Sequence, residues 1–236
     1  MVKLARKLFG ASAIVAVAMV PIAQASVVLD FESIDISPTN LFFPSPLFSP
    51  GDTFAQSGYV MTPDFDFGTV DFASSLGLTA PTGNLTRMYF NSNEGGLIIR
   101  RADGLLFNLD SFSAAFVPLS PAPIPGQRIV IVALGTYAGN SSFATAFSLG
   151  DTSTGSPGPF SAFANALDFG SFVGLKQVEF FACAFDTSPV CSTPTNNNAQ
   201  FAIDNINVTT VPEPGTLALV AFALLGLGLS QRRAVG

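Results

Sequence analysis

The hydrophobic positions of this chain come in short runs, and each run is bounded by glycine, proline, asparagine, aspartate or serine. Phenylalanine, valine and threonine are frequent within the runs, and no helical heptad of useful length occurs. Such a pattern predicts β-strands separated by turns. The predicted strands are 27–32, 58–62, 96–101, 112–117, 128–136, 142–149, 160–167, 175–184 and 201–208.

Alternation within the strands predicts which face is buried. Phe112, Ala114 and Phe116 fall on one face of their strand, as expected for a half-buried sheet. In 201–208 the apolar residues occupy both faces, so the register should break near Asp204. Short strands in this number predict an all-β fold, an antiparallel β-sandwich of the jelly-roll type. Proline-rich stretches at 37–51 and 118–126 are expected to be extended loops.

The first 25 residues have the three parts of a secretory signal peptide. Lys3, Arg6 and Lys7 precede an apolar run at 8–22, and Ala23-Gln24-Ala25 matches a small-residue cleavage site. An uncleaved membrane anchor is the alternative, but the run is short. We therefore expect passage through the Sec export machinery and a body that begins at Ser26.

The last 26 residues, 211–236, form a second segment of three parts. A Pro212-Glu213-Pro214 turn precedes an uncharged run at 216–229, and the paired Arg232 and Arg233 follow. The run would make a short transmembrane helix of about 21 Å, against about 30 Å for the hydrocarbon core. It is therefore either a tail anchor that thins the bilayer, or a signal held in the membrane only until a protease removes it. The arginines would stay cytoplasmic, which leaves the body outside.

The order and spacing of these three parts resemble the PEP-CTERM sorting signal of Gram-negative bacteria. The resemblance covers about a tenth of the chain and implies processing by exosortase, a membrane protease. Substrates of this system are exported proteins often linked to exopolysaccharide. The chain thus divides into a signal peptide (1–25), a β-sandwich domain (26–210) and a sorting signal (211–236), with transient anchoring in the inner membrane.

Charge and residue counts exclude several classes of function. Without the two ends, the body holds five basic and fifteen acidic residues, a net charge of about −10, so we expect no nucleic-acid partner. The chain has no histidine, which excludes Ser-His-Asp and Cys-His catalysis. Cys183 and Cys191 flank a turn and, in an exported protein, predict a disulfide.

The first and last predicted strands supply a candidate metal site. The Phe31-Glu32 and Ile203-Asp204-Asn205 segments resemble the first and last strands of galactose-binding-like jelly-roll modules. That resemblance implies a structural calcium ion held by Glu32 and Asp204, because calcium prefers oxygen ligands. The alternative is that Asp204-Asn205 simply forms a turn or ends a strand.

Two further residue sets bear on chemistry. Asp64 and Asp66 alternate and are the candidate carboxylates of a glycosidase, although a half-buried strand edge explains them more simply. Tyr59, Tyr89 and Tyr137 are the candidate sugar-stacking residues, since tryptophan is absent. The chain is therefore interpreted as a non-enzymatic structural or binding protein of the cell surface or extracellular matrix. The alternatives are a carbohydrate-binding module that recognises exopolysaccharide and a secreted glycosidase.

Overall fold

The computed structural model describes residues 25–35, 46–72, 74, 81–91, 95–117, 128–151, 159–164, 172–185 and 199–211. Within these ranges the chain forms thirteen strands and no α-helix. The strands are β1 (Ser26–Leu29), β2 (Leu47–Phe48), β3 (Phe54–Gln56), β4 (Tyr59–Asp64), β5 (Gly68–Asp71), β6 (Met88–Asn91), β7 (Gly96–Arg101), β8 (Phe107–Phe116), β9 (Arg128–Tyr137), β10 (Ser142–Asp151), β11 (Ser161–Ala164), β12 (Leu175–Phe185) and β13 (Phe201–Thr210).

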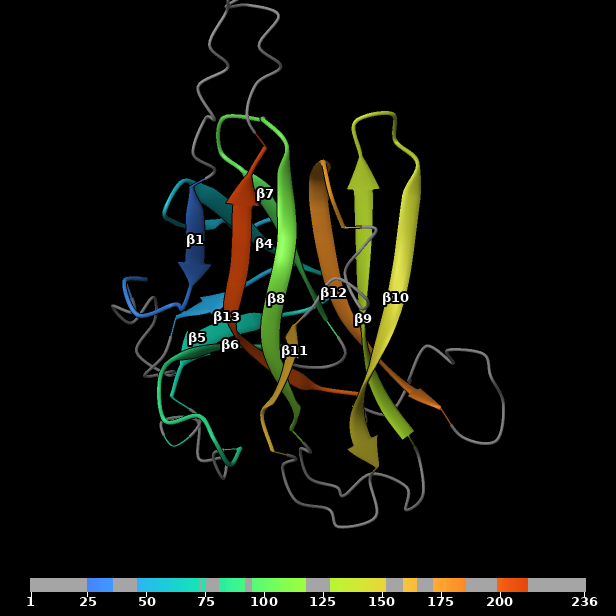
Figure 1. Ribbon diagram of the computed structural model, residues 1–236. Coiled ribbons are helices and arrows are strands. Elements are labelled where there is room, and N and C mark those ends of the chain that lie inside the picture. Colours follow the sequence, from blue (N-terminus) through green and yellow to red (C-terminus); the bar gives the residue numbers. More distant parts are fainter. Residues whose placement is uncertain are drawn as a thin grey trace, which may run out of the picture.

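All pairings are antiparallel, and the strands form two layers (Figure 1). The first layer runs β2-β5-β6-β13-β8, with β1 on β13 and β11 on β8; the second runs β3-β4-β7-β12-β9-β10. Only the pair of Leu175 and Phe107 joins β12 to β8, so the sheet turns from one layer into the other there. The predicted antiparallel β-sandwich is confirmed.

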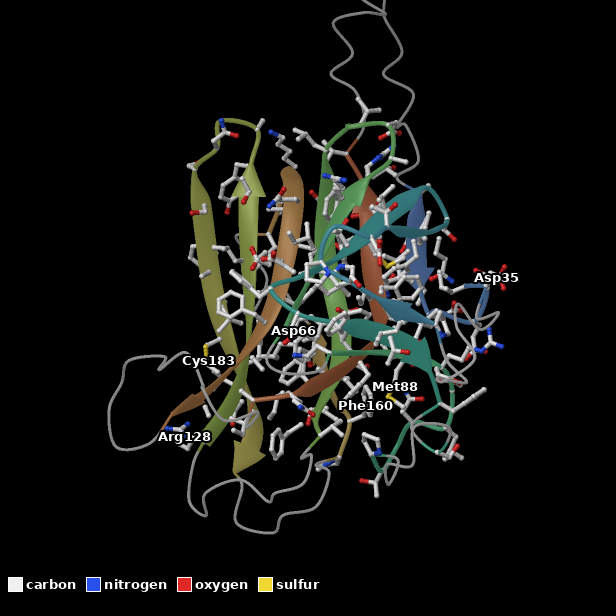
Figure 2. All side chains as sticks on the ribbon, turned by 180° about the vertical axis from the view of Figure 1, so that it is seen from behind. Asp35, Asp66, Met88, Arg128, Phe160 and Cys183 are labelled. Carbon is white, nitrogen blue, oxygen red and sulfur yellow. The ribbon has the colours of Figure 1, made fainter. Side chains whose placement is uncertain are left out.

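A phenylalanine cluster joins the two layers. Phe112 on β8 packs edge-on against Phe147 of β10 and Phe180 of β12, with ring centroids 5.2 and 4.9 Å apart. Phe163 of β11 lies 5.1 Å from Phe112 and from Phe147. The predicted inward face of Phe112, Ala114 and Phe116 is confirmed, because all three are buried. A second, smaller cluster contains Met88 and Phe160, both labelled in Figure 2.

The strand β13 lies in the middle of the first layer. It pairs with β8 along one side, and with β6 and then β1 along the other. The expected register break is confirmed: the pairing with β8 shifts between Asp204 and Asn207, and Asn205 adopts a positive φ of 51°. One expected loop needs correction, because Leu47–Phe48 within 37–51 is strand β2, paired with Gly68 and Thr69 of β5.

The described ranges contain no helix long and apolar enough to cross a membrane. The predicted signal peptide and the C-terminal apolar run lie almost wholly outside these ranges, so both stay predictions.

Candidate functional site

The outer face of the second layer, which points away from the aromatic core, carries three half-buried polar side chains: Thr62, Asp64 and Glu179. Side chains along β4 alternate: Tyr59, Met61 and Pro63 are buried, whereas Val60, Thr62 and Asp64 are half-buried on the opposite face. The register of β4, β7 and β12 extends this outer face across the three strands. Thr62 of β4 is the cross-strand partner of Ile98 on β7, and Ile98 is the cross-strand partner of Glu179 on β12.

Asp64 and Glu179 meet across the intervening strand β7. Asp64 is paired with Gly96, and Gly96 is paired in turn with Phe181 of β12. A Cβ atom at Gly96 would lie only 2.9 Å from the carbonyl oxygen of Phe180. Because this position has no side chain, the Glu179 carboxyl reaches that of Asp64 and shares a hydrogen bond with it.

The carboxyl pair holds a proton near neutral pH. Burial raises the pKa of Glu179 from 4.5 to about 7, and the negative charge of Asp64 and the shared hydrogen bond act in the same direction. The hydroxyl of Thr62, on the same face, is buried and has no hydrogen-bond partner among the described residues. The face therefore carries a carboxyl pair that shares one proton, with an unsatisfied hydroxyl buried near it.

An exposed phenylalanine stands in the turn after β4. Phe65 follows Asp64, is 78% exposed and has a φ of 65°, a conformation that is strained for a residue with a bulky side chain. The turn is held by the Asp66 amide, which donates to the Asp64 carbonyl at 2.8 Å, and by the Asp66 carboxylate, which accepts from the Phe67 amide at 2.7 Å. Phe67 is also exposed. The fold thus exposes an aromatic ring in the turn that directly follows Asp64.

The predicted pairing of Asp64 with Asp66 is not what the structure forms. Asp66, labelled in Figure 2, lies in the exposed turn after β4, whereas Asp64 faces Glu179. Glycosidase carboxyl groups stand about 5–5.5 Å or about 6.5–9.5 Å apart, to admit the sugar carbon or a water. Two carboxyl groups in hydrogen-bond contact leave no such room.

Two of the three predicted sugar-stacking tyrosines are buried. Tyr59 is 2% exposed and Tyr89 is 0% exposed, so neither ring can stack on a surface ligand, and that part of the prediction is wrong. Tyr59 packs edge-on against Phe107, while the Tyr89 hydroxyl donates to the Gly96 carbonyl at 2.9 Å. Tyr137 is half-buried at the end of β9 and packs against the edge of the core.

Asp204 lies at the centre of a buried polar cluster. It is 0% exposed, and its carboxylate accepts hydrogen bonds from Asn84 at 2.6 Å, from Thr86 at 3.0 Å and from the Asn205 amide at 2.7 Å. Burial raises the pKa of Asp204 to about 6; these hydrogen bonds oppose the shift, and the negative charge of Asp30 adds to it.

Glu32, the other predicted calcium ligand, is engaged elsewhere. Its carboxylate accepts from the Arg87 amide at 2.8 Å, and its carbonyl accepts from the Arg87 guanidinium at 2.9 Å. Within the described ranges, no three acidic, cysteine or histidine side chains gather as a metal site would require. One set of hydrogen bonds thus ties β13 to Asn84 and Thr86, and a second ties Glu32 to Arg87.

The remaining predicted residues are only partly described. Cys183 is buried in β12, whereas Cys191 falls outside the described residues, so the disulfide stays a prediction. Pro212, Glu213, Pro214, Arg232 and Arg233 also lie outside them.

Comparison with known proteins identifies the C-terminal segment. Residues 210–233 match the PEP-CTERM protein-sorting motif. The motif implies that the chain is exported, that an exosortase processes it, and that it resides at the cell envelope or surface. A search of curated protein sequences found no significant match.

Solved structures with a related arrangement include a DUF4465 family protein from Bacteroides caccae, at 11% identity and a TM-score of 0.43, over 79% of this chain and 100% of that one. The CBM22-1-CBM22-2 tandem domain of Paenibacillus barcinonensis Xyn10C aligns at 14% identity and a TM-score of 0.36, over 80% and 51%. The CBM22-1 xylan-binding domain of the same protein aligns at 11% identity and 0.34, over 81% and 99%. Values this low carry no inference on what the present chain binds.

The raised pKa of Glu179 predicts that stability falls as pH rises. The folded protein keeps a proton on Glu179 that the unfolded chain releases, so the free energy of unfolding should fall between about pH 4.5 and pH 7. Asp204 acts in the same direction between pH 3.8 and about pH 6. Thermal melting of the exported protein across this range should show a higher Tm at the acidic end.

The variant Glu179→Gln should flatten the pH dependence of Tm at the neutral end of this range, because an amide does not titrate. Asp66→Asn removes one carboxyl from the exposed turn and serves as the charge-matched control, which should keep the original slope. An unchanged slope in Glu179→Gln would show that this carboxyl does not cause the effect.

Proposed function

We propose that this chain is a binding protein of the cell surface or extracellular matrix, and that its sandwich contacts an extracellular polysaccharide. The observation that carries the proposal is the exposed, strained Phe65, in the turn that directly follows Asp64 of the carboxyl pair. Strained residues persist where the surrounding structure enforces them, and they gather at functional sites. The sorting motif supports the proposal, because export to the cell envelope or surface would expose this site to extracellular polysaccharide.

The chemistry of the outer face fits a ligand rich in hydroxyl groups. An exposed aromatic ring provides an apolar platform for the C–H face of a sugar. The proton of the carboxyl pair lies in the hydrogen bond between Asp64 and Glu179, and the remaining carboxyl oxygen lone pairs can accept hydrogen bonds. The hydroxyl groups of a polyol can donate to these oxygens.

Charge favours a neutral polysaccharide over an acidic one. The body carries about ten net negative charges, and the site itself is acidic. A polyuronate or sulfated chain would be repelled at neutral pH, when Glu179 is partly ionised. A structural role without a defined glycan is the competing function. The contact between the two carboxyl groups argues against a glycosidase, as described above.

The glycan proposal predicts a loss of binding on removal of the exposed ring. Phe65→Ala should weaken binding of the exported protein to its best neutral glycan on a glycan array by about tenfold, the equivalent of one stacking contact. Leu85→Ala is the matched control, since Leu85 is 87% exposed but lies outside the outer face. Undiminished binding by Phe65→Ala, or selective binding of no glycan, would contradict the proposal.

We also propose that Glu32 and Asp204 hold a structural calcium ion, as the resemblance to galactose-binding-like modules implies. A cation there would have to displace the Asn84 and Thr86 donors from the Asp204 carboxylate. If the ion binds, calcium added to chelator-treated protein will raise the Tm, and Asp204→Asn will abolish the rise. A Tm that is the same with chelator and with calcium would remove the ion from the proposal.

The sorting tail is proposed to anchor the protein only transiently. Protein recovered from an exosortase-bearing host should therefore lack Arg232 and Arg233, whereas a host without exosortase should retain them. Intact-mass and peptide mass spectrometry distinguish the two forms. A full-length C-terminal peptide from the first host would show that the tail is a permanent anchor.

A further inference from the structure

The strand β10 presents a long free edge. Within the described ranges, β10 pairs only with β9, and it forms the outer border of the second layer in Figure 1. The other border strands are short: β1 and β11 have four residues, β3 has three and β2 has two, whereas β10 has ten. Short border strands limit unwanted pairing between molecules. The strand β10 lacks this protection.

The hairpin that joins β9 to β10 determines which backbone groups are free. The Tyr137 amide donates to the Ser141 carbonyl at 2.9 Å, and the Asn140 amide donates to the Tyr137 carbonyl at 3.0 Å, with Asn140 at a φ of 59°. This is a three-residue loop closed by a hydrogen-bonded pair, so every second residue from Ser141 onward bonds to β9. The amide and carbonyl groups that point away from β9 belong to Ser142, Ala144, Ala146 and Ser148.

This free edge is uncharged, and no other strand of the described ranges covers it. From Ser142 to Gly150 it contains no charged residue and no proline, and the register stays regular up to the irregularity between Ser148 and Gly150. The four side chains that flank the free groups are small and exposed. Natural edges are usually blocked by lysine, proline or a bulge. Here a second strand can approach along seven residues.

We propose that β10 pairs with β10 of a second copy of this chain, antiparallel and about a twofold axis through Thr145. This inference is independent of the proposed glycan site. In this register Ala144 faces the partner's Ala146, and Ser142 faces the partner's Ser148. The free groups then form about eight hydrogen bonds across the dimer, and the two second layers become one continuous sheet.

The exposed part of Phe143 supports a second copy rather than an unrelated strand. Phe143 lies on the core-facing side of β10, packs edge-on against Phe172 at 5.6 Å, and is nevertheless 40% exposed. In the twofold register it faces the partner's Phe147, and each copy covers the other's ring. Small residues meet small residues on the outer face, and no like charges oppose each other, so the edge is complementary to itself.

Charge reversal at the edge tests the register. The exported protein should be a dimer in sedimentation equilibrium, and Ala144→Lys combined with Ala146→Lys should halve the observed mass, because two pairs of lysines then face each other. Ala144→Lys combined with Ala146→Glu places each lysine opposite a glutamate and should restore the dimer. Leu85→Lys combined with Val173→Lys adds the same charge at exposed positions elsewhere and should leave the dimer intact.

Cysteine cross-linking tests the axis directly. Thr145 would face its own copy in a non-hydrogen-bonded pair, at a Cα separation of about 4.5 Å, which is within the range that a disulfide spans. Thr145→Cys should therefore form a dimer on a non-reducing gel, whereas Ser148→Cys, which faces Ser142 of the partner subunit, should not. A monomeric wild type, a dimer that persists in the double-lysine variant, or an open polymer would each overturn the proposal.

Discussion

The structure depends on the packing of phenylalanine rings between two sheets. The chain has 24 phenylalanines and no tryptophan, and Phe112 alone contacts rings from three other strands. These contacts bridge the layers, whereas strands β8 and β12 pair directly only at Leu175 and Phe107. The burial of ring area and the edge-on contacts between rings therefore hold the layers together, while hydrogen bonds hold each layer.

The candidate site lies on the face of the second layer opposite the aromatic core. Along β4 the inner face buries Tyr59, Met61 and Pro63, and the opposite face holds Thr62 and Asp64, with Glu179 of β12 beside Asp64. The missing side chain of Gly96 leaves room for the carboxyl contact, and the backbone carbonyl at the same position accepts the Tyr89 hydroxyl on the buried side. One glycine thereby links the core to the candidate site.

Most of the fold was predictable from the sequence. Each of the nine predicted strands overlaps an observed one, and the break near Asp204 occurs where both faces of 201–208 are apolar. The missed strands are β2, β3, β5 and β6. Strands β2 and β3 are too short to show a period, and all four residues of β5 and of β6 are buried, so neither alternates.

The candidate site was predictable only in part. Asp64 on β4 and Glu179 on β12 come together because both strands pair with β7, and the sequence does not show how these three strands are aligned. A lone glutamate in the apolar run of β12 was the one available signal.

The central place of β13 has a consequence for the order of events during secretion. The last strand of the domain occupies the middle of the first layer, and Val211, directly before the sorting motif's Pro212, still donates to the Leu106 carbonyl at 3.2 Å. The N-terminal strands therefore cannot complete their sheet until 201–210 has been synthesised and translocated. Such long-range topology favours a chain that stays unfolded, and so competent for export, until its end arrives. The sandwich therefore closes only when the segment that directly precedes Pro212 of the sorting motif is present.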